Sequence, residues 1–150
     1  MRDSTERAFE AYGKPLETVS TFKYLGRVMT AGDDDWPAVA GNLVKARKSW
    51  GSLSRILSRE GADKRVSVNF SKAVVQAVLL FGAETWVLTL RIERALESFQ
   101  NGAALRITGR QPQRSGDRQW THPPLEEAMR EAGFEGIRKI ITRRQNTVVQ

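Results

Sequence analysis

The sequence predicts a mainly α-helical fold: a bundle of three long helices and two short C-terminal helices, preceded by a small N-terminal β-hairpin. Apolar residues recur at helical spacing over residues 36–59 and again over residues 91–108. The first 30 residues combine extended patterns with a turn signal. With 150 residues and 40% hydrophobic content, the chain can bury one core.

We expect three segments: a hairpin over residues 1–31, a three-helix bundle over residues 32–109, and a loop with short helices over residues 110–150. In the first segment, residues 8–12 alternate apolar and polar side chains, and residues 19–29 are rich in β-forming residues. A Gly-Lys-Pro turn separates the two stretches. This arrangement favours paired strands.

The first long helix is predicted from about Trp36 to about Arg59. The three aspartates at residues 33–35 can accept hydrogen bonds from its free N–H groups, and Pro37 is tolerated in the first turn. One face is apolar and consists of Trp36, Ala40, Leu43, Ala46, Trp50, Leu53 and Leu57. The opposite face carries cations within about 80° of arc, namely Lys45, Lys48, Arg55 and Arg59. Arg47 falls on the flank of the apolar face.

Two further long helices complete the predicted bundle. The second is expected over Lys64 to Leu88, and from Ala73 onward it is apolar almost all round, which is typical of a helix buried on most sides. The third is expected from about Arg91 to Thr108, with an apolar stripe that also contains Arg106.

The last segment begins with a loop. Residues 110–124 are rich in proline and charge, which predicts irregular structure. A short helix is expected from Leu125 to Ala132, closed by Gly133. Another is expected from about Glu135 to about Gln145.

The net charge of +7 is unevenly distributed. Residues 36–72 carry eight Lys/Arg against two Asp/Glu, a net +6, whereas residues 1–35 carry −2 and residues 73–150 carry +3. An exposed helix face usually mixes both signs, but no acid occurs between Trp36 and Arg59. A solvated surface remains the alternative, but a one-sign face favours contact with a polyanion such as nucleic acid.

Five short stretches, in this order, resemble the region that follows the catalytic core in reverse transcriptases of non-LTR (LINE-type) retrotransposons. They are Phe9-Glu10-Ala11-Tyr12-Gly13, Phe22-Lys23-Tyr24-Leu25-Gly26, Phe81-Gly82-Ala83-Glu84-Thr85-Trp86, Pro124-Leu125-Glu126-Glu127-Ala128 and Arg143-Arg144-Gln145-Asn146-Thr147. The resemblance covers the chain from about Phe9 to its end. It implies that the first 30 residues are the end of the palm, that the three long helices are the thumb, and that the remainder is a linker.

The resemblance also implies site residues and a partner. The Tyr-Leu-Gly hairpin would grip the primer strand, with nucleic-acid contacts from Lys23, Tyr24, Gly26 and Arg27. The first long helix would follow the phosphates of an RNA–DNA or RNA duplex without reading its sequence, through Lys45, Lys48, Arg55 and Arg59. Without the resemblance, the same hairpin is an ordinary strand pair with Gly26 at a bulge or at a point of close approach.

No catalytic residue is expected in this chain. The family's Mg²⁺-binding aspartate pair precedes the Tyr-Leu-Gly element, whereas residues 33–35 follow it and open a helix. We therefore expect a piece of an enzyme without polymerase activity of its own and without a cofactor, since Mg²⁺ would belong to the missing palm. His122 is the only histidine and there is no cysteine, so no zinc site is expected.

Glu84 lies in an apolar run, where a buried carboxylate needs a partner. Arg47 and Arg106 are the arginines placed on apolar stripes. We therefore expect a structural ion pair between Glu84 and one of them.

The competing hypothesis is a helical protein-interaction module that self-associates, or a remnant of a retroelement without present function. The missing palm would leave apolar surface uncovered, with Phe9, Tyr12, Phe22 and Leu25 as candidates for self-association. The polar N-terminus gives no signal-peptide pattern, and the apolar run from Ala73 to Leu88 is too short to span a bilayer. We expect an intracellular protein, nuclear or cytoplasmic, without a membrane partner.

Overall fold

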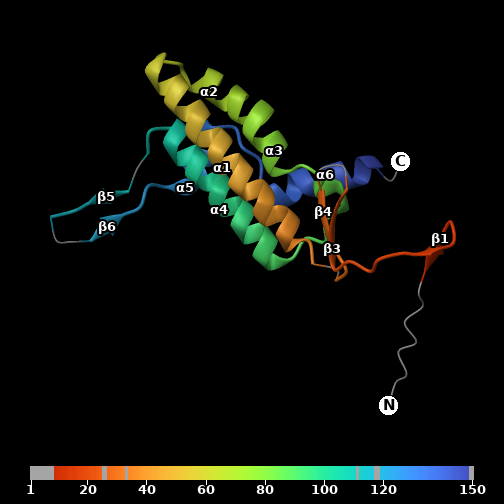
Figure 1. The fold of residues 1–150 in the computed structure, drawn as a ribbon. Helices are drawn as coiled ribbons and strands as arrows, with labels where there is room; N and C mark the ends of the chain where they lie inside the picture. Colours follow the sequence, from red (N-terminus) through yellow and green to blue (C-terminus); the bar gives the residue numbers. More distant parts are fainter. Residues whose placement is uncertain (1–8, 25–26, 33, 111, 117–118, 149–150) are drawn as a thin grey trace.

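The computed structural model describes residues 9–24, 27–32, 34–110, 112–116 and 119–148. The predicted mainly α-helical fold is confirmed, with small antiparallel hairpins near the N-terminus (Figure 1). The helices are α1 (Trp36–Arg59), α2 (Lys64–Phe70), a π-helical turn (Ser71–Gln76), α3 (Ala77–Leu79), a 3₁₀ turn (Ala83–Thr85), α4 (Leu90–Ile107), α5 (Leu125–Glu131) and α6 (Ile137–Val148). The strands pair as β1 (Glu10–Ala11) with β2 (Lys14–Pro15), β3 (Thr21–Tyr24) with β4 (Arg27–Thr30), and β5 (Gln113–Arg114) with β6 (Trp120–Thr121).

Helix α1 forms over the predicted residues because its apolar side chains meet the rest of the core. Val39, Leu43, Ala46 and Trp50 are buried in one cluster with residues of α3, α4 and α6. Burial of each of the larger side chains on this face stabilises the fold by roughly 1.5 to 3 kcal/mol. This burial fixes which face of α1 points away from the bundle.

The start of α1 is held by two aspartates in different ways. Oδ1 of Asp34 accepts a hydrogen bond from the N–H of Trp36 at 2.9 Å, which confirms the expected helix-start role for that residue. The Asp35 carboxylate instead accepts a hydrogen bond from the N–H of Val87 at 2.8 Å. It therefore ties the start of α1 to the segment that precedes α4. Asp33 lies outside the described residues.

The predicted second long helix is wrong in its C-terminal third. The helical path from Lys64 ends at Leu79, since Gly82 takes a left-handed conformation with φ of 79°. A single 3₁₀ turn follows, and Trp86 is extended. Nδ2 of Asn42 in α1 donates a hydrogen bond to the carbonyl oxygen of Phe81 at 2.9 Å, which satisfies a main-chain group that the helix no longer pairs.

Helices α4 and α6 pack into the same core cluster as the buried face of α1. Leu96 of α4 and Ile137 and Ile141 of α6 are fully buried in the main apolar cluster. The buried side chain of Gln100 donates a hydrogen bond to the carbonyl oxygen of Glu135 at 2.7 Å, which fixes the chain just before α6. The short helix α5 packs on α4 through a smaller cluster of alanines.

The hairpins lie at the edges of the bundle. The predicted single N-terminal hairpin is two: β1–β2 projects away from the helices, whereas β4 of the second hairpin contacts α1 (Figure 1). Residues 110–124 were expected to be loop throughout, but the structure adds the β5–β6 pair, which extends from the opposite end of the bundle (Figure 1).

Candidate nucleic-acid interface

The outward face of α1 carries the cations that the sequence placed there. Lys45, Lys48, Arg55 and Arg59 are exposed, while the buried residues of α1 lie on the opposite side. Their spacing follows the helical period, so four positive groups share one solvent-facing stripe. Exposed Val44 and Ile56 accompany them.

Within the part of the chain that the structure describes, these cations make few contacts with acids. Nε of Arg55 donates to the carbonyl oxygen of Gly51 at 2.9 Å, and Nε of Arg59 lies 3.5 Å from the Glu60 carboxylate. The side chains of Arg59 and Glu60 are 84% and 65% exposed, so that pair contributes little. Within the described residues, Lys45 and Lys48 form no ion pair. The stripe keeps most of its charge for an external partner.

Several cations of α2, α6 and the segment after α4 are instead paired with carboxylates of other elements. Arg138 binds Glu93 through two hydrogen bonds, one of 2.7 Å from Nε, which lowers the pKa of Glu93 and raises the pKa of Arg138. Hydrogen bonds from Lys64 and Arg110 lower the pKa of Glu131 in the same way. These pairs join α4 to α6 and α2 to α5. The positive charge of these residues is therefore balanced by carboxylates within the molecule.

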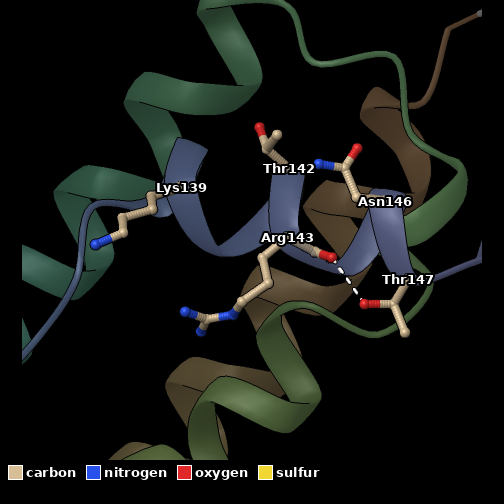
Figure 2. A pocket seen from close by; sticks show the side chains of 5 residues that line it. All are labelled: Lys139, Thr142, Arg143, Asn146 and Thr147. Atoms are coloured by element: carbon tan, nitrogen blue, oxygen red, sulfur yellow. Dashed lines mark hydrogen bonds between the residues drawn. The ribbon is translucent and has the colours of Figure 1, made fainter.

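A second basic surface lies on α6, where an open hollow of about 470 Å³ is lined by polar side chains. Figure 2 shows Lys139, Thr142, Arg143, Asn146 and Thr147 along this face. Both cations contact one carboxylate, that of Glu135, at 3.5 Å and 2.8 Å respectively, and the hydrogen bond from Arg143 lowers the pKa of Glu135. This surface is less positive than its residue types indicate.

The hairpin residues are only partly described. Lys23 and Tyr24 are exposed at the end of β3, and the Tyr24 ring lies 6.2 Å from the Phe22 ring. Arg27 pairs with Tyr24 in the antiparallel register. Gly26, predicted as a close-approach point, lies outside the described residues, as does Leu25.

The predicted ion pair of Glu84 with Arg47 or Arg106 is wrong. Oε1 of Glu84 lies 3.6 Å from Nη1 of Arg144, which also donates to the carbonyl oxygen of Leu80 at 3.0 Å. The helix ends before Glu84, so its side chain sits in the 3₁₀ turn against α6, one-third exposed, and not within the bundle. Arg47 and Arg106 are exposed instead, and both line a groove between α1 and α4.

Comparison with known proteins gives no family for this chain. No protein-family model, curated protein or solved structure matches it. Within the described residues, no helix combines the length and apolar character needed to cross a membrane. In that same part of the chain, no group of three or more His, Cys, Asp or Glu residues could hold a metal ion.

Proposed function

We propose that this chain binds the backbone of an RNA–DNA or RNA duplex, without sequence specificity, along the outward face of α1. The observation that carries the proposal is the set of four exposed cations on one helix face, in a helix without a single acid. Such a face repels itself until a polyanion neutralises it. The resemblance to the region after the catalytic core of non-LTR reverse transcriptases supports the same partner.

The dimensions of the stripe suit a duplex backbone. Lys45 and Arg59 are 14 positions apart in one helix, which corresponds to about 21 Å along its axis. Along the axis of a duplex each strand carries one phosphate per about 3.4 Å, so a stripe of this length runs past roughly six phosphates of a strand, which is enough for each of the four cations to meet one. Lysine and arginine on flexible stems reach phosphate oxygens without reading base edges, so the binding is expected to tolerate any sequence.

The β3–β4 hairpin would extend this interface. It contacts α1 through β4, and Lys23 and Tyr24 are exposed on it. We propose that it approaches the primer strand next to the duplex held on α1. Polymerase chemistry is not proposed for this chain. Purified protein is expected to give no template-directed incorporation of dNTPs on a primed RNA, even with Mg²⁺ added.

The proposal is tested by titrating a fluorescent RNA–DNA hybrid with the wild-type chain and with K45E/K48E/R55E. The variant is expected to lose binding, because three attractive charges become repulsive. A matched control, R94E/R114E/R130E, reverses three exposed charges on α4, β5 and α5. Equal binding by wild type and K45E/K48E/R55E would contradict the proposal, as would equal losses in both variants.

Self-association is the second candidate, because aromatic side chains of the N-terminal hairpins are exposed. Phe9 is 70% exposed, Phe22 is 48% exposed and Tyr12 is fully exposed. In this second candidate function, the exposed rings pair two copies of the chain. Light scattering at low and high salt separates the candidates, since apolar dimers persist at high salt whereas phosphate contacts weaken.

A further inference from the structure

The groove between α1 and α4 brings together two arginines that sequence patterns placed on separate apolar stripes. Arg47 of α1 and Arg106 of α4 line one hollow of about 400 Å³. Both are exposed, and neither forms an ion pair with another described residue. Trp50 and Phe99 add apolar wall and Ser98 adds a hydroxyl, while no acid of the described part of the chain lines the hollow.

This combination of groups suits a phosphate. A guanidinium offers a planar fork of N–H donors that matches two phosphate oxygens. Two like charges along an apolar wall also focus positive potential into the groove, because the wall screens less than water does. An anion in the groove relieves the repulsion between Arg47 and Arg106.

The volume of the groove and the residues next to it limit which part of a nucleic acid can bind there. Pockets for small organic ligands measure about 300 to 1,000 Å³, so this hollow can take one nucleotide unit but not a double helix. Gly51 lines the groove, and its carbonyl oxygen accepts the hydrogen bond from Arg55. Arg55 of the outward face of α1 is therefore hydrogen-bonded to a residue that lines the groove, so a phosphate backbone on that face has a short path into it.

We propose that the α1–α4 groove binds a backbone phosphate of a single strand that extends from the duplex held on α1. The inference rests on the proposed function and deepens it, since it separates where the paired and unpaired parts of a nucleic acid are held. Arg47 and Arg106 are its ligand-binding residues.

The experiment compares three ligands of identical core duplex: one blunt, one with a short single-stranded tail, and one lengthened by the same number of base pairs. Two variants are measured beside the wild type. R47Q/R106Q removes both charges, and G102L fills the groove without changing charge. Gly102 is exposed and lines the hollow, and an added Cβ there meets no atom within 4 Å, so the new side chain starts in open space. The thermal unfolding midpoint of G102L checks that the fold is kept.

For the wild type we expect the single-stranded tail to strengthen binding by about tenfold, the size of one charge-assisted hydrogen bond. Both variants should lose that gain and keep the affinity for the blunt duplex. A tail gain that survives in either variant, or an equal gain from the base-paired extension, overturns the groove assignment and leaves duplex binding on α1 standing. Absence of any duplex binding by the wild type overturns the proposed function itself.

Discussion

The salt dependence of duplex binding should report how many cations on the outward face of α1 contact phosphates. We consider K45Q/K48Q/R55Q, which removes three of the four charges and keeps side chains of comparable length. All three positions are exposed, so the change should leave folding intact. The thermal unfolding midpoint of the variant checks this directly.

The magnitude follows from counterion release. Each phosphate neutralised on a duplex contributes about 0.9 to the slope of log affinity against log salt, so four contacts give a slope of about −3.6. Raising salt from about 50 mM to about 200 mM then weakens wild-type binding roughly 150-fold. The variant keeps one of these contacts and should show a slope of about −0.9, or about 3.5-fold weakening over the same range. Additional contacts from the hairpin would steepen both slopes equally.

Fluorescence anisotropy of a labelled RNA–DNA hybrid at four salt concentrations measures both slopes. The matched control is R94Q/R114Q/R130Q, which removes three exposed charges from other elements. The reasoning is refuted if K45Q/K48Q/R55Q keeps the wild-type slope. It is refuted equally if the control variant loses as much slope as the α1 variant.

Three further predictions concern stability and assembly. N42A should destabilise the fold by about 1 to 3 kcal/mol, because Asn42 is buried and donates hydrogen bonds to the carbonyl oxygens of Leu79 and Phe81 at the end of α3. Chemical denaturation measures this, and an unchanged midpoint would contradict it. The contact with Arg138 lowers the pKa of Glu93 below its ordinary value of 4.5. The stabilisation of the fold by this ion pair is therefore present above that pH and is lost as the pH falls through the folded-state pKa. E93Q should flatten this part of the stability–pH profile, and a profile unchanged from wild type would contradict the prediction. Replacing Phe9 and Phe22 by serine should remove any salt-insensitive dimer seen by light scattering, and dimers that persist would assign self-association to another surface.

Sequence patterns predicted the elements that have a clear period or a clear boundary. Helix α1 runs over the predicted residues because a continuous apolar stripe, a proline in the first turn and Gly61 after its end agree. The end of α3 could not be predicted in the same way. The run from Ala73 to Leu88 is apolar almost all round, so no period shows where the helix stops, and the left-handed turn at Gly82 ends it.

The same limit applies to the candidate site. The exposure of the α1 cations follows from helical geometry, so local sequence was enough to predict it. The partner of Glu84 is Arg144, which lies 60 residues further along the chain in α6. This contact depends on how α6 packs against the 3₁₀ turn, and no local pattern in the sequence contains it. The joint placement of Arg47 and Arg106 in one groove likewise arises only when α1 and α4 pack together.

Lysine footprinting tests most directly whether a duplex lies along α1. The chain is modified with a lysine-specific reagent with and without a saturating RNA–DNA hybrid, and the reactivity of each lysine is read by mass spectrometry. A duplex along α1 should protect the exposed Lys45 and Lys48 and leave Lys139 on α6 as reactive as in the free chain. Undiminished reactivity of Lys45 and Lys48 in the bound state would contradict it.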